Sequence, residues 1–211
     1  LDGRVDAYCA VGAARGAKLK TNELWTDLAT ARARQVSVEM GVDDPLGRGR
    51  RATFLDLDGD PYPDLFVTSD PLRVDGLPSM ARAFLDGQGR RFVPAGELGL
   101  ELPIGGACAL SADLDGDGRN EVLVCTEESW GSGVGIHVFR RVGGRFRDAT
   151  RALGVTPAGA VDPASADLDG DGRADLVQLS RTRLTVSLQR GGRLVRVRSM
   201  GVTAGTAIGI G

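Results

Sequence analysis

An acidic segment recurs in register along the 211-residue chain. It reads FLDLDGDPYPDLFVTS at 54–69, SADLDGDGRNEVLVCT at 111–126 and SADLDGDGRADLVQLS at 165–180. Its last acidic residue falls at Asp64, Glu121 and Asp175, so that the copies lie 57 and 54 residues apart. A repeat of this period indicates a fold in which one supersecondary unit is stacked several times.

A second segment follows each acidic one. It reads RRFVPAGELGL at 90–100, GRFRDATRALGV at 144–155 and GRLVRVRSMGV at 192–202, and an earlier copy, ARQVSVEMGV at 33–42, follows the opening LDGRVDAYCAV. In this register a closing glycine falls at Gly41, Gly99, Gly154 and Gly201. We therefore divide the chain, as one domain, into the repeats 1–46, 47–104, 105–158 and 159–211.

Within a repeat the pattern is typical of strands. DLFVTS, EVLVCT and DLVQLS are short apolar runs bounded by turn residues, and GIHVFRR and RLTVSLQR alternate with a period close to two. Gly-containing turns follow, which predicts hairpins and about four antiparallel strands per repeat. The stretch 21–34 has a composition that a helix could adopt, but its register with the other repeats favours a pair of strands. The sequence predicts an all-β fold.

The acidic segment has the form D-x-D-x-D-G-x-x-[DE]. Acidic side chains at loop positions 1, 3, 5 and 9, together with the carbonyl of position 7, can surround one cation with hard oxygen ligands, which suits Ca²⁺. Such crowded carboxylates repel one another unless a cation neutralises them. The predicted ligands of the two regular loops are Asp113, Asp115, Asp117, Arg119 and Glu121, and Asp167, Asp169, Asp171, Arg173 and Asp175. An EF-hand is excluded, because position 12 is Val67, Val124 or Gln178 instead of Glu and no helices flank the loop.

Two copies depart from this pattern. The loop at 56–64 supplies Asp56, Asp58, Asp60, Tyr62 and Asp64, but Pro61 takes the position of the glycine. Proline cannot adopt the positive φ that a tight turn requires there, so we expect this loop to be distorted and to bind calcium most weakly of the complete loops. The first copy retains only its second half, with Asp2 at position 5 and Asp6 at position 9.

These loops and their flanking strands resemble the FG-GAP/VCBS repeats of β-propellers like those of integrin α-subunits, and FRDATRALGV is similar to the subgroup that includes cartilage acidic protein 1. The resemblance covers nearly the whole chain. It implies a β-propeller with one four-stranded blade per repeat, calcium in the blade hairpins, and an extracellular binding or adhesion role. Such propellers usually have more blades. Because the chain starts inside a loop and GTAIGIG at 205–211 resembles a strand before the next loop, we expect about four blades of a longer propeller.

Three functions are compatible with this pattern. The first is a calcium-stabilised, non-catalytic binding module, which would contact a protein or glycan ligand through the variable loops between repeats, with Trp130 as a candidate contact. The second is a structural spacer, which the sequence does not distinguish from the first. The alternative is a carbohydrate-binding propeller or a lyase-type enzyme. No nucleophile or metalloprotease motif supports catalysis, and the single histidine, His137, lies in an alternating strand. We therefore predict that the protein is not an enzyme.

Charge and cysteine content limit the remaining possibilities. The net charge is −2, and the 26 basic residues are nearly all Arg. We interpret these arginines as solvated strand residues and expect no nucleic-acid partner. No apolar run approaches the ~18 residues of a membrane-spanning helix. Cys9, Cys108 and Cys125 all lie in apolar runs, as buried small side chains or as one disulfide and one free thiol. Calcium loops of this kind suit the calcium concentration outside cells, so we expect a secreted or cell-surface location.

Overall fold

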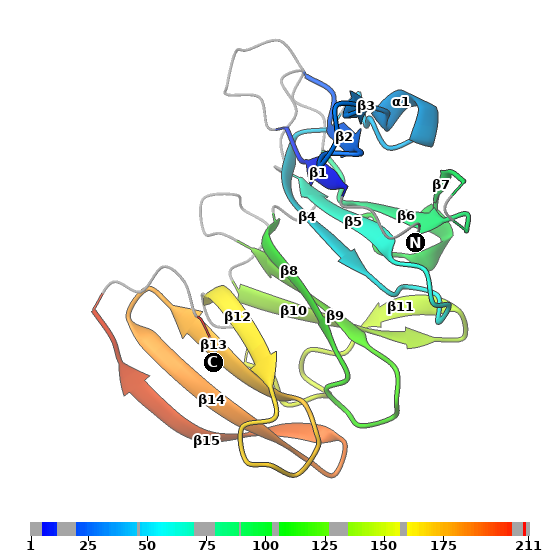
Figure 1. Cartoon of the computed structure of the whole chain (residues 1–211). Coiled ribbons are helices and arrows are strands. Elements are labelled where there is room, and N and C mark those ends of the chain that lie inside the picture. Colours follow the sequence, from blue (N-terminus) through cyan, green and yellow to red (C-terminus); the bar gives the residue numbers. More distant parts are fainter. Residues whose placement is uncertain are drawn as a thin grey trace. The chain divides into compact units, whose positions relative to one another are not determined.

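The computed structural model describes residues 6–11, 20–45, 47–69, 79–88, 90–102, 106–126, 135–156, 160–203 and 209. The chain forms two compact units, Leu1–Gly105 and Gly106–Gly211, each of which is built from two antiparallel sheets (Figure 1). Asp2 and Trp130 lie outside the described residues, as does nearly all of the segment 205–211. Among the described residues, no helix is long and apolar enough to cross a membrane.

The first unit contains a three-stranded and a four-stranded sheet, each with its strands in chain order. The first sheet consists of β1 (Ala7–Cys9), β2 (Glu23–Thr26) and β3 (Arg34–Gln35), and a short helix, α1 (Ser37–Met40), follows it. The second consists of β4 (Gly49–Leu55), β5 (Asp64–Ser69), β6 (Arg82–Asp86) and β7 (Phe92–Pro94), followed by the 3-10 helix η1 (Gly96–Leu98). Trp25 pairs with Gln35 across β2 and β3, which confirms the strand pair expected in this region.

The second unit contains two four-stranded sheets, again with the strands in chain order. The third sheet consists of β8 (Gly106–Ala112), β9 (Glu121–Thr126), β10 (Gly135–Val142) and β11 (Arg145–Asp148). The fourth consists of β12 (Ala160–Ala166), β13 (Asp175–Ser180), β14 (Arg183–Arg190) and β15 (Arg193–Gly201). These sheets have the up-and-down order of propeller blades.

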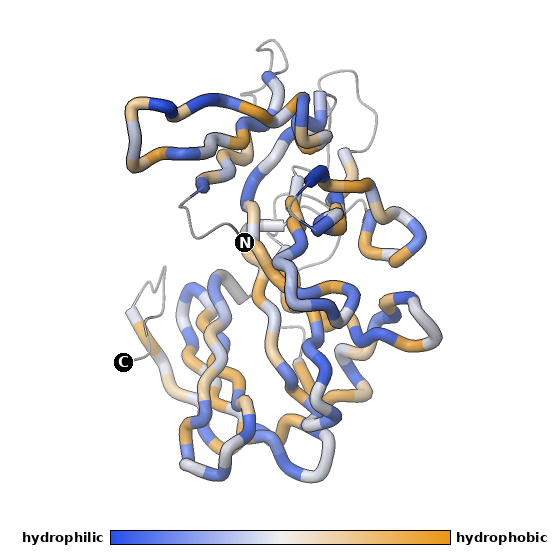
Figure 2. Tube along the Cα trace, turned by 45° about the vertical axis from the view of Figure 1, so that its right-hand side comes forward, coloured by the Kyte–Doolittle hydropathy of each residue, from blue (hydrophilic) through white to orange (hydrophobic). Residues whose placement is uncertain are grey.

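The second strand of each four-stranded sheet is its most buried part. Every residue of β5 and β9 is buried, and β13 is buried except at Ser180. A strand that is covered on both faces reads as a continuous apolar run, which explains why DLFVTS and EVLVCT do not alternate. Elsewhere hydrophobic and hydrophilic residues interleave along the chain (Figure 2), as expected for strands with one buried face.

Each unit has its core between its two sheets. In the first unit Leu24 of the first sheet packs in one cluster with Leu65 and Phe84 of the second. In the second unit Leu123 and Ile136 of the third sheet pack in one cluster with Leu176 of the fourth. Stacking of sheets therefore supplies the hydrophobic core of each unit, as in other repeat proteins, where a single repeat cannot bury its own apolar face.

The closing segment of the fourth repeat differs from our expectation. Gly41, Gly99 and Gly154 have left-handed φ values of 77°, 79° and 79° and end short turns. Gly201 instead belongs to β15, where it pairs with Arg183. In the third repeat, Asp148 Oδ1 accepts hydrogen bonds from both the amide and the hydroxyl of Thr150, and these bonds start the turn. The fourth repeat has Arg196 and Arg198 at these two positions, so the strand continues.

Candidate metal centre

Three acidic loops join the first strand to the second in the three four-stranded sheets. In each of them the carboxylates of loop positions 1, 3 and 9 converge, with one oxygen of each within 4.8 Å of the others. The three groups are Asp56, Asp58 and Asp64; Asp113, Asp115 and Glu121; and Asp167, Asp169 and Asp175. Three of the four predicted carboxylate positions are therefore brought together in every complete loop.

The carboxylate of position 1 organises the turn in the two regular loops. Asp113 accepts hydrogen bonds from the amides of Gly116 at 2.7 Å and Gly118 at 2.9 Å. Asp167 accepts from Gly170 and Gly172, both at 2.8 Å, and the bond from Gly172 lowers the pKa of Asp167. These bonds bend the backbone around the carboxylate, as Asx turns do.

The turn has one further requirement, a glycine at position 4, which the predicted ligand pattern did not include. Gly59, Gly116 and Gly170 have φ values of 95°, 78° and 79°, which favour glycine as strongly as position 6 does. The signal was present in the sequence, because all three copies carry Gly at this position.

The carboxylate of position 9 ties the loop to the sheet. Asp64, Glu121 and Asp175 are at most 1% exposed, and each accepts the amide of position 2, from Leu57, Leu114 and Leu168 respectively, at 2.7 to 2.9 Å. Burial raises the pKa of Asp64 to about 6 and that of Glu121 to about 7. A bound cation would favour the charged form and offset this cost.

The carboxylates of position 5 do not join the converging groups. Asp60, Asp117 and Asp171 each accept the amide of position 7, from Tyr62, Arg119 and Arg173 respectively, at 2.8 to 3.0 Å. They stabilise the second half of the turn in this structure. Their ligation of a metal, and that of the position 7 carbonyls, stays a prediction.

Pro61 removes one backbone hydrogen bond from the loop at 56–64. Asp56 accepts a hydrogen bond from the amide of Gly59 at 2.6 Å, the same bond from position 4 to position 1 that the other two loops make. Proline has no N–H group, so the second bond to position 1, made by Gly118 and Gly172 in the other loops, has no counterpart here. The three carboxylates nevertheless converge.

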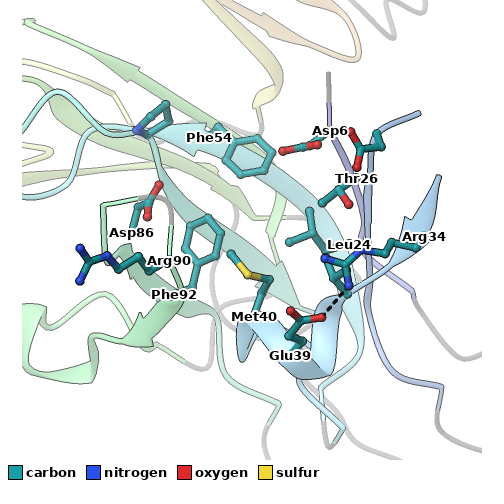
Figure 3. A pocket seen from close by; sticks show the side chains of 13 residues that line it. Asp6, Leu24, Thr26, Arg34, Glu39, Met40, Phe54, Asp86, Arg90 and Phe92 are labelled. Atoms are coloured by element: carbon teal, nitrogen blue, oxygen red, sulfur yellow. Dashed lines mark hydrogen bonds and ion pairs between the residues drawn. The ribbon is translucent and has the colours of Figure 1, made fainter. Parts of the chain in front are cut away.

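The half loop at the start of the chain places Asp6 elsewhere. Asp6 lies at the wall of a pocket of about 600 Å³ in the first unit, which Phe54, Phe92 and Met40 also line (Figure 3). Of the residues that the structure describes, none joins Asp6 in a converging acidic group.

Two arginines, which the sequence analysis did not single out, reach the loops of the second unit. Nη1 of Arg140 lies 3.0 Å from Oδ2 of Asp115. Nη1 of Arg190 lies 2.9 Å from Oδ2 of Asp171, and its Nη2 also bonds Asp169. Both arginines belong to the third strand of their sheet. The hydrogen bond to Asp115 raises the pKa of Arg140, and the bond to Asp169 raises that of Arg190.

Gln189 lies between the two loops of the second unit. Its backbone amide donates a 2.8 Å hydrogen bond to Oδ1 of Asp175 in its own loop. Its side chain packs on the other loop, where a Cβ built on Gly116 would be only 2.9 Å from its Nε2. The loop at 113–121 therefore rests on the neighbouring sheet.

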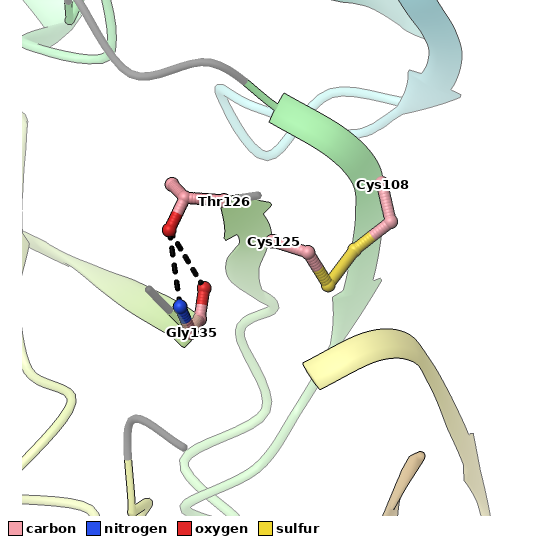
Figure 4. The surroundings of a disulfide bond; sticks show 4 residues. All are labelled: Cys108, Cys125, Thr126 and Gly135. Atoms are coloured by element: carbon pink, nitrogen blue, oxygen red, sulfur yellow. Dashed lines mark hydrogen bonds between the residues drawn. A yellow bond between two sulfur atoms is a disulfide. The ribbon is translucent and has the colours of Figure 1, made fainter. Parts of the chain in front are cut away.

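The structure pairs two of the three cysteines. Cys108 and Cys125 stand directly opposite each other on β8 and β9, with their Cα atoms 5.0 Å apart, and form a disulfide (Figure 4). Cys9 is free and exposed. Of the two possibilities left open by the sequence, the structure has one disulfide and one free thiol.

His137 lies in β10, as its alternating sequence predicts. Its Nδ1 is 3.9 Å from Oδ2 of Asp148, in the segment that starts the closing turn. It is not part of any of the three converging acidic groups.

The sequence pattern of the FG-GAP-like repeat family matches residues 56–124 and again residues 113–178. The two matches together span more than half of the chain, and each contains two acidic loops. The chain belongs to the FG-GAP-like repeat family. No curated protein has a sequence that matches it. The donor set of these FG-GAP-like loops consists of carboxylate oxygens, which fit a hard divalent cation such as Ca²⁺.

Two solved structures are similar to this FG-GAP-like repeat chain. One is described as the structure of the Dos1 propeller, with a TM-score of 0.50 at 10% identity over 89% of this chain and 44% of that one. The other is a Photorhabdus luminescens Tc holotoxin pore, with a TM-score of 0.33 at 16% identity over 96% of this chain and 13% of that one. The chain thus spans less than half the length of either. The likeness to the Dos1 propeller confirms the expected β-propeller fold.

Proposed function

We propose that this FG-GAP repeat chain is a calcium-binding, non-catalytic module of an extracellular protein, where it serves as a binding or structural scaffold. One observation carries the proposal: the same three loop positions bring three carboxylates together in three sheets. A single acidic cluster is common on protein surfaces, but the same cluster at the same place in three repeats requires a shared cause. Neutralisation by a cation supplies that cause.

Calcium is favoured over magnesium by the shape of the donor set. The loops offer carboxylate oxygens on a flexible turn, which suits the variable coordination of Ca²⁺, whereas Mg²⁺ demands a near-octahedral shell and keeps several waters. Asp113 and Asp167 already hold the turn through backbone amides, so the loop is close to its binding conformation without metal. When calcium is bound, it would stabilise the turn and neutralise the buried acid at position 9.

Two features support an extracellular location. The Cys108–Cys125 disulfide is of a kind that persists in oxidising compartments. Loops of modest affinity suit millimolar calcium, and affinities of about 10⁻⁴–10⁻³ M are typical of extracellular calcium modules. We propose that partners, protein or glycan, bind through the loops between repeats.

The test is a calcium titration of the whole chain by isothermal calorimetry, with magnesium as the comparison. We expect calcium to bind and magnesium to bind more weakly. If a loop binds with a dissociation constant of about 1 mM, 10 mM calcium stabilises the fold by about 1.4 kcal/mol per occupied loop. Three loops would raise the melting temperature above that in EDTA by about 8–16 °C. Identical melting curves in calcium and EDTA would show that these loops are not metal sites.

A further inference from the structure

In the two acidic loops of the second unit, an arginine side chain forms ion pairs with the carboxylates. Arg140 reaches back from β10 to Asp115, whose side chain is only 7% exposed. Arg190 reaches back from β14 to both Asp169 and Asp171. Asp115 and Asp169 occupy loop position 3, and both belong to the converging groups. Each guanidinium therefore bonds a carboxylate that a metal ion would also need.

The strand register shows that the two arginines reach their loops from different positions along the third strand. Arg140 follows Phe139, which pairs with Val122 at the start of β9. Arg190 lies three residues beyond Ser187, which pairs with Leu176 at the equivalent place in β13. The arginines thus occupy different register positions. Arg140 corresponds to Leu188 in the fourth sheet, and Arg190 corresponds to Val142 in the third sheet. Both arginines nevertheless reach position 3 of their own loop.

Among the residues that the structure describes, the loop at 56–64 has no such cation. In its sheet Phe84 pairs with Leu65, as Phe139 does with Val122. The positions equivalent to those of Arg140 and Arg190 are therefore occupied by Leu85 and Gly87. Within the described part of the chain, no arginine or lysine forms an ion pair with Asp56, Asp58 or Asp64. The three loops therefore share an acid arrangement and differ in whether an arginine neutralises it.

We propose that Arg140 and Arg190 are built-in counter-ions that stabilise the metal-free loops at 113–121 and 167–175 and lower their affinity for calcium. This inference rests on the proposed calcium function. A guanidinium that bonds position 3 reduces carboxylate repulsion while the metal is absent, and it competes with and repels the divalent ion when calcium arrives. Both side chains are about 40% exposed, so each can leave its carboxylate and extend into water.

The arrangement has two consequences of opposite sign, which a structural role alone would not give. Removal of the arginine raises the calcium affinity of its own loop. It also lowers the stability of the metal-free protein. If the arginine merely packed on the sheet, its removal would lower stability and leave calcium affinity unchanged. If it positioned the ligands, its removal would lower calcium affinity.

The experiment uses Arg140→Leu and Arg190→Val in the full chain, because Leu188 and Val142 already occupy these register positions in the opposite sheet. Arg181→Leu is the control for net charge, because Arg181 is exposed in the turn between β13 and β14, at the other end of β13 from its acidic loop. Calcium binding is followed by NMR at the amides of Gly118 and Gly172, which report the two loops separately. Melting temperatures are measured in EDTA.

We expect Arg140→Leu to tighten the calcium binding reported by Gly118 by about three- to tenfold, and to change the binding reported by Gly172 by less than about twofold. The gain comes from the loss of one partly exposed ion pair and of the repulsion between the arginine and the calcium ion. Arg190→Val should do the reverse. In EDTA each variant should melt about 1–4 °C below the Arg181→Leu control. Affinity that equals the control, or falls below it, would overturn the inference while leaving the calcium function intact. Absence of calcium binding by the unmodified chain would overturn the calcium function itself and this inference with it.

Discussion

The amide of Gly118 donates a 2.9 Å hydrogen bond to Oδ2 of Asp113, and only a residue with an N–H group and a left-handed backbone can make it. Gly172 and Asp167 repeat this relationship at 2.8 Å. The loop at 56–64 has Pro61 at the corresponding place and lacks the bond. The three acidic groups converge alike, so this bond is the main difference in how the turns themselves are held.

We expect Pro61→Gly to increase the calcium affinity of the loop at 56–64 by about threefold to tenfold, since one additional hydrogen bond contributes about 0.5–1.5 kcal/mol. The reverse change, Gly118→Pro, should weaken the loop at 113–121 by at least as much, because proline removes the bond and cannot take φ of 82°. NMR titrations that follow the amides of Gly59 and Gly116 measure each loop separately. A Pro61→Gly chain that binds no more tightly than the unmodified one would show that the bond does not limit affinity.

The metal-free protein should become less stable as the pH rises from about 5 to 7.5. Burial raises the pKa of Glu121 from 4.5 to about 7 in the folded chain, so the folded state keeps a proton that the unfolded state releases. Stability therefore falls with pH in this window, by about 2 kcal/mol for this group after allowance for solvent screening. Asp64, with its pKa raised to about 6, acts in the same direction.

Urea unfolding in EDTA at a series of pH values measures this slope, and Glu121→Gln is the control, since it keeps the side-chain shape and does not titrate. The stability of the Glu121→Gln chain relative to the unmodified chain should increase as the pH rises. A stability that instead increased between pH 5 and 7.5 in the unmodified chain alone would contradict the assignment. Calcium should abolish the fall, because metal binding requires the ionised carboxylate.

The disulfide should contribute about 2–4 kcal/mol to stability, because it closes a loop between residues 17 apart in the sequence. We expect the double change Cys108→Ala and Cys125→Ala to lower the guanidinium midpoint, and a reducing agent to lower the midpoint of the unmodified chain as well. Cys9→Ser is the matched control and should have little effect, because Cys9 is exposed and unpaired. Equal midpoints for the double variant and the control would mean that the bridge does not stabilise the fold.

Two glycines that the repeat register treats as equivalent should respond differently to alanine. Gly154 has a φ of 79°, and a Cβ there would be 2.4 Å from the carbonyl oxygen of Leu194, so Gly154→Ala should cost about 2–3 kcal/mol. Gly201 lies in β15 with nothing near its Cβ position, so Gly201→Ala should change stability by less than about 0.5 kcal/mol. Chemical denaturation of the two variants tests the difference, and similar losses would contradict the extended conformation of Gly201.

Short-range spacing alone determined much of this protein. Acids at loop positions 1, 3 and 9 converge as predicted because nine consecutive residues that bend around the Asp113 carboxylate bring their own side chains together. The buried second strands were recognisable for a similar reason, since an apolar run between turn residues carries its own signal. The strand pair at Trp25 and Gln35 followed from the repeat register.

The tertiary structure alone decided the features that depend on how separate strands align. Cys108 and Cys125 pair because the register of β8 and β9 places them opposite each other. Arg140 and Arg190 meet acids 25 and 21 residues away because of where the third strand passes the loop. Residue spacing encodes a turn within one loop, whereas contacts between strands follow from pairing and stacking, which no local pattern in this sequence specifies.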